Sequence, residues 1–146
     1  MKTSHTSTGI ITELSPALGY ANAFYVSNYE GGQGVTLADR DSIPNVNIKR
    51  APFSSADNTW KHIVIVIDTN LDANNSTKIF VNKIQITLET LYGLNQNTIN
   101  NFGSYPLFIG QRGGSSLGFN GQIKFLKVFN YPLSTTEITN LYNKTM

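Results

Sequence analysis

Short runs of apolar and β-branched residues recur along the chain, and turn-forming residues separate them. Runs of this kind, bounded by Gly, Pro, Asn, Asp or Ser, are typical of β-strands. The chain therefore predicts an antiparallel all-β domain. The runs that we expect to form strands are Gly9–Leu14, Ala23–Ser27, Gly34–Ala38, Val46–Lys49, Trp60–Asp68, Lys78–Asn82, Ile84–Leu88, Pro106–Gly110 and Gly121–Phe129.

The strongest strand signal lies in Trp60–Asp68. Its residues Ile63 to Ile67 are all apolar and β-branched, without a polar residue between them. A continuous run of this kind suits a strand that is covered on both faces, in the middle of a layered domain. A helix is the competing interpretation, but five consecutive β-branched residues disfavour a helix because their side chains crowd the preceding turn.

Turn-forming residues mark the connections between these strands. Asp39-Arg40-Asp41 is expected to end the third strand, and Asn82-Lys83 to form the turn of a hairpin. The least regular stretch, Leu91 to Tyr105, predicts a long loop.

One helix is expected, close to the C-terminal end of the sequence. Ser134-Thr135-Thr136-Glu137 has the pattern of a capping box, in which the serine and glutamate side chains satisfy each other's backbone N–H groups. Ile138, Leu141 and Tyr142 then follow at helical spacing on one face. Strands followed by one short helical turn predict an antiparallel β-sandwich of the jelly-roll type. We place residues 1–8 in a polar N-terminal tail and residues 9–146 in the sandwich.

Composition and charge narrow the classes of function. The length of 146 residues suits one domain, and the net charge of +2, from scattered basic residues, does not predict nucleic-acid binding. The sequence has no cysteine, which excludes disulfides, thiolate zinc sites and cysteine nucleophiles. No apolar run approaches the roughly 20 residues that span a bilayer, so we expect no membrane insertion. The polar first residues lack the apolar stretch of a signal peptide.

Three segments in the second half of the chain resemble a known family. They occur in the family's order, and their spacing makes the resemblance specific over about residues 58–143. They are similar to motifs of the laminin-G-like branch of the concanavalin A-like lectin and glucanase superfamily. The segments are Trp60-Lys61-His62-Ile63 running to Asp68, then Lys78–Lys83, and finally Leu107–Gly110, Phe119–Ile123 and Phe129–Ile138.

The resemblance implies a concanavalin A-like sandwich, and this chain departs from the family pattern at three points. Lys83 stands where the family usually has glycine, and Lys124-Phe125 replaces the usual acidic pair. The family also has earlier strands before the one that Ile10-Ile11 matches. We expect their lack to leave a sheet edge or groove open, which a strand from a neighbour could close.

Catalysis is not expected. Glucanase relatives carry alternating acids on one strand, and glycoside hydrolysis needs two carboxylates close together. No such string occurs here, and among the nine acids only Asp39 and Asp41 are two positions apart. A G-x-S-x-G nucleophile elbow is also lacking. We therefore predict that the protein is not an enzyme.

The resemblance also implies a calcium ion, since many relatives bind calcium at the rim of the sandwich. Carboxylates and backbone carbonyls suit this hard cation. The candidate ligands are Asp39 and Asp41, with Asp68 or Asp72 as a second source. The alternative is that these aspartates only form turns.

Carbohydrate binding needs exposed aromatic rings flanked by hydrogen-bonding side chains. The loop-rich part of the chain provides both kinds of residue. The candidates for contact with a glycan are Tyr92, Asn95, Asn97, Asn101, Tyr105 and Arg112.

Two functions follow as hypotheses. The first is a non-catalytic binding module that recognises glycans or glycoproteins on another surface. The alternative is a structural protein, such as a decoration or shell component of a virus particle or surface layer, that contacts copies of itself or other structural proteins. Both predict an extracellular or particle-surface location, and the second predicts a homo-oligomer.

Overall fold

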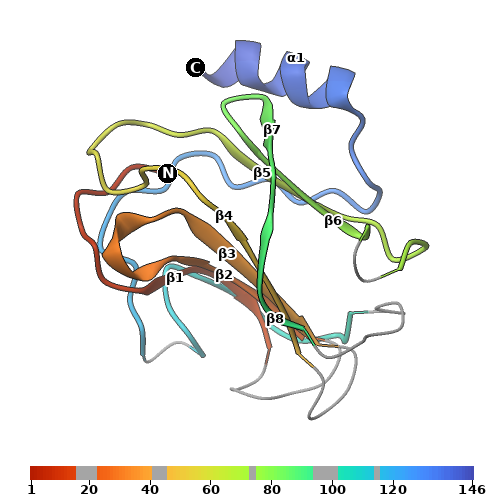
Figure 1. The fold of residues 1–146 in the computed structure, drawn as a ribbon, viewed down its shortest axis with the longest axis horizontal. Coiled ribbons are helices and arrows are strands. Elements are labelled where there is room, and N and C mark those ends of the chain that lie inside the picture. The colour runs from red at the N-terminus through yellow and green to blue at the C-terminus, as the bar shows by residue number, and fades with distance from the viewer. Residues whose placement is uncertain (16–22, 41–45, 73–74, 94–101, 114–115) are drawn as a thin grey trace.

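Two antiparallel sheets lie one above the other, and a helix covers the outer side of the smaller sheet (Figure 1). The computed structural model describes residues 1–15, 23–40, 46–72, 75–93, 102–113 and 116–146. Within these ranges the chain forms nine strands, one short 3-10 helix over Glu30–Gly32 and one α-helix. The predicted all-β, antiparallel sandwich is confirmed.

The larger sheet has six strands in the order β8-β4-β3-β2-β1-β9, and all neighbours are antiparallel. Among the described residues β8 and β9 are its outermost strands, and β1 lies inside the sheet between β2 and β9. Their bounds are β1 Gly9–Leu14, β2 Ala23–Asn28, β3 Val35–Arg40, β4 Asn47–Ala51, β8 Glu89–Gly93 and β9 Leu107–Ile109.

The smaller sheet has the strand order β5-β6-β7, with β5 at Ile63–Ile67, β6 at Thr77–Val81 and β7 at Ile84–Ile86. Its two faces are covered by different layers. Ile63, Ile65 and Ile67 pack with the core of the larger sheet, whereas Val64 and Val66 pack with the helix residue Ile138. The expectation that the apolar run is covered on both faces is therefore confirmed.

The helix α1 spans Thr135–Thr145 and is longer than the single turn that we expected. The predicted capping box is present: the Glu137 N–H donates to Ser134 Oγ, and the Ser134 N–H donates to Glu137 Oε2 at 2.8 Å. The hydrogen bond from the Ser134 side chain, with a second one from its backbone, lowers the pKa of the Glu137 carboxyl. Ile138 is fully buried, and Leu141 and Tyr142 are half-buried. The described helix is not long and apolar enough to cross a membrane.

The hairpin between β6 and β7 turns at Asn82-Lys83, as predicted. Both residues are left-handed, with φ of 48° and 65°, which is the geometry of a tight type I′ turn. Asn82 also accepts a hydrogen bond from the His62 N–H on its Oδ1, at 3.0 Å. This side chain therefore joins the turn to the segment that precedes β5.

We expect Asn82→Ala to lower the free energy of unfolding by about 1–2 kcal/mol, because it removes this hydrogen bond and leaves alanine in a left-handed conformation. Asn82→Gly loses the same hydrogen bond but tolerates the backbone, so it should cost less than the alanine variant. Urea denaturation of the two variants measures both effects. Equal stability of wild type and Asn82→Ala would contradict the role of this turn.

Three predicted boundaries are wrong. Asp39 and Arg40 do not follow the third strand but are the last two residues of β3, where Asp39 pairs with β2 and β4 and Arg40 pairs with β2. Leu91, Tyr92 and Gly93 are not loop residues; they belong to β8, which pairs with β4. Gly121–Phe129 forms no strand: the only pairing in this stretch is an isolated bridge from Gln122 to Lys2 among the described residues.

Residues 1–8, predicted as a polar tail, make several contacts with the sandwich. Lys2 and Gln122 exchange two backbone hydrogen bonds, and the Gly31 N–H donates to the Thr6 carbonyl. The buried Asn28 side chain donates to the carbonyls of His5 and Ser7, at 3.3 Å each. These contacts hold the segment against the loops that follow β2 and β9.

Candidate functional site

The outer face of the larger sheet, which points away from the smaller sheet, combines aromatic and charged side chains. Residues paired across antiparallel strands share a face. Val26 and Leu37 pack in the core between the sheets, so their neighbours Tyr25 and Ala38 face outward. Two rows of outward residues follow from the register. They are Phe108, Glu13, Tyr25, Ala38, Ile48 and Tyr92 in one row and Ser27, Thr36, Arg50 and Glu89 in the other.

The centre of this outer face is made of small residues. Ala38, Thr36 and Ser27 are buried, and the hydroxyls of Ser27 and Thr36 share a hydrogen bond of 2.5 Å. On either side stand the rings of Tyr25, which is half-buried, and Tyr92, which is 48% exposed. Three interstrand spacings separate β2 from β8, so the two backbones lie about 14 Å apart. The face therefore presents two tyrosines across a flat, small-residue floor.

An ion pair anchors one side of this face. Glu13 is only 2% exposed, and its Oε2 accepts the Gly113 N–H at 3.1 Å. Arg112 Nε lies 3.3 Å from Glu13 Oε1, as an ion pair without an aligned hydrogen bond. The Arg112 guanidinium also stacks 4.5 Å above the centre of the Tyr25 ring. Glu13 thus positions Arg112, and Arg112 in turn holds Tyr25.

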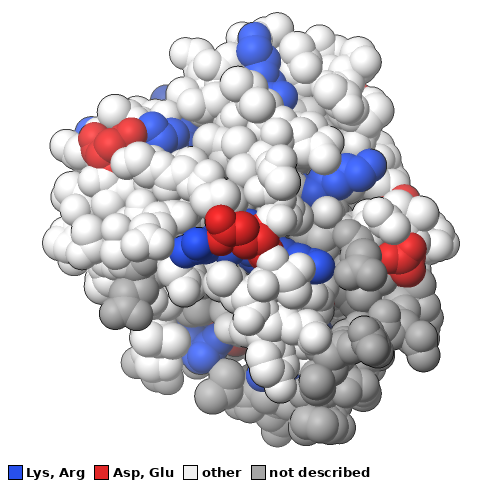
Figure 2. Space-filling view, viewed as in Figure 1, with Lys and Arg blue, Asp and Glu red and all other residues white. Residues whose placement is uncertain are grey.

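A second charged group lies toward β8. Arg50 pairs with Glu89 through its Nε and Nη2 atoms, and its Nη1 donates to Gln33 Oε1 at 3.0 Å. The Arg50 guanidinium lies 4.6 Å from the centre of the Tyr29 ring. Basic and acidic side chains also occur in small mixed groups on the side of the molecule that Figure 2 shows. The acids of the outer face are therefore already paired with arginines.

The structure brings two of the six predicted glycan contacts to this face. Tyr92 lies on β8 and Arg112 follows β9, with both side chains at the outer face. Tyr105 is half-buried and lies two residues before β9. The other three predicted residues, Asn95, Asn97 and Asn101, lie outside the described residues.

Sequence reasoning missed Tyr25 and Arg50. Tyr25 lies in a predicted strand, and its functional importance depends on the face of the sheet to which it points. The alternation in Ala23–Ser27 was the available signal, since it places Tyr25 on the opposite face from Phe24 and Val26. Arg50 lies one residue beyond the predicted strand Val46–Lys49, so the sequence pattern did not predict which residues pair with Arg50 across the sheet.

The described aspartates do not by themselves form a calcium site. Asp39 is buried on the inner side of β3, in register with Phe24 and Asn47. Asp68 follows β5 in the other sheet, and its Oδ1 accepts two hydrogen bonds from Asn70, at 3.0 and 3.1 Å. Asp41 lies outside the described residues, which contain no group of three metal-binding side chains. Calcium binding stays a prediction.

The contacts of His62 indicate a structural role for this residue. Its ring packs edge-to-face on Tyr142 of α1, with 5.8 Å between the ring centres. Burial, with the nearby positive charges of the N-terminal amine and Lys127, lowers the pKa of the imidazole. A neutral imidazole that packs on α1 suits a structural contact between the helix and the segment that precedes β5.

Comparison with known proteins gives one match. A family model described as the concanavalin A-like lectin/glucanases superfamily, of the laminin G type, matches residues 2–139. Searches of curated proteins and of solved structures gave no significant match.

Proposed function

Since the chain belongs to the concanavalin A-like lectin/glucanases superfamily, we propose that it is a non-catalytic module that binds glycans or the glycans of glycoproteins. The observation that carries this proposal is the row of Tyr25, Ala38, Ile48 and Tyr92 across the outer face. Fold alone does not establish function, so the proposal depends on the chemistry of this face.

A sugar ring offers an apolar face of C–H groups and an edge of hydroxyls. Tyrosine rings match the first, and the guanidinium groups of Arg112 and Arg50 provide fixed donors for the second. Because each guanidinium is held by a carboxylate and an aromatic ring, little side-chain entropy is lost when a ligand binds. The spacing of the tyrosines suits an extended oligosaccharide rather than a single sugar.

The acids of this face support the non-catalytic part of the proposal. Glu13 and Glu89 are the described acids that the register places on the outer face. Four interstrand spacings separate β1 from β8, so their backbones lie about 19 Å apart. A pair of carboxylates in a glycosidase is about 5–10 Å apart. These two glutamates are therefore better suited to position arginines than to act together on one glycosidic bond.

A glycan array, followed by titration calorimetry with a soluble oligosaccharide, tests the proposal. We expect Tyr25→Ala or Tyr92→Ala to weaken binding about tenfold or more, since aromatic anchors dominate such contacts. Ile84→Ala is the control, because Ile84 is 65% exposed but lies on β7 of the smaller sheet, away from the outer face. We also expect no release of reducing ends from the bound oligosaccharide.

Two results would contradict this assignment. One is the lack of binding to any glycan on the array by a folded protein. The other is equal loss of affinity in the Tyr92→Ala and Ile84→Ala variants, which would move the site away from the outer face.

A further inference from the structure

Five large apolar side chains are exposed along one short segment near the C-terminal end of the sandwich. They are Phe125, Leu126, Val128, Phe129 and Tyr131, which we call the apolar strip. Val128 is 74% exposed and Phe125 is 65% exposed, so the strip includes the most exposed large apolar residues that the structure describes. Phe129 and Tyr131 also contact each other edge-to-face, with 6.0 Å between ring centres.

The backbone of the strip belongs to neither sheet. Although Gly121–Phe129 has the composition of a strand, Ile123 to Asn130 forms no strand with any described residue. Phe125 is left-handed, with φ of 59°, which interrupts an extended chain and is unfavourable for a bulky residue. The side chains before and after Phe125 consequently do not alternate between core and solvent, and most of them face solvent.

The apolar area of the strip is large enough for a stable interface. A large apolar side chain offers on the order of 200 Å² when fully exposed, so five that are half exposed present on the order of 500 Å². A stable dimer buries about 800 Å² on each partner, and about 65% of a homodimer interface is apolar. The exposed apolar area of the strip is therefore about as large as the apolar area that one partner contributes to such a dimer interface.

The charges around the strip favour a second copy in the opposite direction. Lys124 precedes the strip, with its Nζ atom 5.0 Å above the centre of the Phe125 ring, and Lys127 lies within it. At the other end, Tyr131 donates a hydrogen bond of 3.1 Å to the exposed Glu137. The segment thus has a positive charge at its beginning, from Lys124, and a negative charge at its end, from Glu137. A twofold axis near Val128 would place Lys124 of each copy opposite the end of the strip in the other copy, where Glu137 lies, whereas Lys127 lies one residue from the axis.

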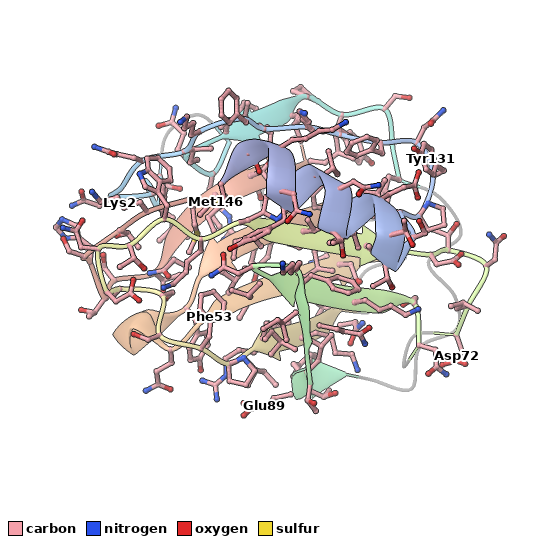
Figure 3. All side chains as sticks on the ribbon, turned by 90° about the horizontal axis from the view of Figure 1, so that it is seen from above. Lys2, Phe53, Asp72, Glu89, Tyr131 and Met146 are labelled. Carbon is pink, nitrogen blue, oxygen red and sulfur yellow. The ribbon has the colours of Figure 1, made fainter. Side chains whose placement is uncertain are left out.

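We propose that the apolar strip is the interface of a twofold symmetric homodimer, in which two copies of the segment Lys124–Tyr131 pair in opposite directions. The apolar side chains form its centre, and Lys124 and Glu137 form its charged rim. In the view of Figure 3, Tyr131 and Glu89 of β8 lie on opposite sides of the molecule. The dimer goes beyond glycan binding and does not depend on it.

Light scattering after size-exclusion chromatography, over a series of protein concentrations, tests this proposal. The wild type should have twice the chain mass of 16.1 kDa. Val128→Asp should raise the dissociation constant of the dimer on the order of 30-fold or more, because it places a charge at the centre of the interface. Circular dichroism checks that the variant is folded, which we expect because Val128 has little contact with the core.

Ile84→Asp is the matched control. Ile84 is 65% exposed, as Phe125 is, but it lies on β7 in the smaller sheet. This variant should remain dimeric with the wild-type dissociation constant. A monomeric wild type at every concentration would overturn the proposal, and so would a Val128→Asp variant that remains as dimeric as the wild type. Equal dissociation by Ile84→Asp would overturn the location of the interface.

Discussion

Replacing Gly34 by alanine should prevent the domain from folding or leave it with only a small fraction of its stability. Gly34 precedes β3 and has a φ of 124°, which side-chain-bearing residues rarely adopt. A Cβ atom at this position would lie 2.0 Å from the Ala51 carbonyl oxygen and 3.2 Å from the Phe53 nitrogen. Both neighbours are backbone atoms, so no side-chain rotation relieves the overlap.

The backbone around Gly34 is also held from several sides. The Tyr29 N–H donates to the Gly34 carbonyl at 2.9 Å, and the Gly34 N–H donates to Ser55 Oγ at 3.3 Å. Ser55 in turn donates to Asn28, and both residues are buried. Relief of the overlap would therefore break a buried polar network. We expect a loss above about 4 kcal/mol, which is comparable to the whole stability of a domain.

Circular dichroism and thermal unfolding measure this effect, with Gly110→Ala as the control. Gly110 is left-handed too, with φ of 80°, but a Cβ atom there has no neighbour within 4 Å. The control should cost only the backbone term of about 1–2 kcal/mol. A Gly34→Ala variant that melts as the control does would show that close backbone approach is not what requires glycine here.

The second large effect is expected at Ile138, which joins the helix to the smaller sheet. Ile138 is fully buried and packs against Val66 and Phe80, with Val64 and Leu133 around them. Ile138→Ala should lower the free energy of unfolding by about 3 kcal/mol, through lost burial and the cavity that remains. For a domain of this size that corresponds to a fall in the melting temperature of about 10 °C.

The exposed Asn140, two residues further along α1, provides the control for this variant. Asn140→Ala should change stability by no more than about 0.5 kcal/mol, because it removes no buried contact. If the Ile138 variant unfolds at the wild-type temperature, α1 does not stabilise the sandwich through this contact.

Local chemistry explains the parts of the fold that the sequence predicted well. The hairpin at Asn82-Lys83 and the capping box at Ser134 and Glu137 each depend on residues a few positions apart. The strand at Ile63–Ile67 was also predictable from adjacent residues. Consecutive β-branched residues disfavour a helix, and the lack of polar residues among them disfavours a strand with one exposed face. The resemblance to the laminin-G-like family over the second half pointed to the same sandwich, and the family match over residues 2–139 confirms it.

Prediction failed where long-range pairing decides the outcome. Tyr92 lies in a stretch without a strand pattern, yet it belongs to β8 because β4 offers an edge for pairing. Gly121–Phe129 has a strand composition but stays outside both sheets, with Phe125 in a left-handed conformation. A pattern of residue types contains no information about which partner strand is available, so both errors have one physical origin.

In the candidate site, too, some features were predictable from the sequence and others depend on long-range pairing. Tyrosines and an arginine in loop-rich segments, and the lack of an acidic catalytic string, could be seen in the sequence, so a sugar-binding, non-catalytic role was a reasonable hypothesis. Only the register of β1 to β4 and β8 places Tyr25, Ala38, Ile48 and Tyr92 in one row, and only the buried Glu13 explains why Arg112 stacks on Tyr25. The sequence by itself determined most of the strands, the turn and the cap, because the turn, the cap and the stronger strand signals depend on neighbours along the chain. Tertiary structure decided which side chains meet, because sheet order joins residues that are far apart in the sequence.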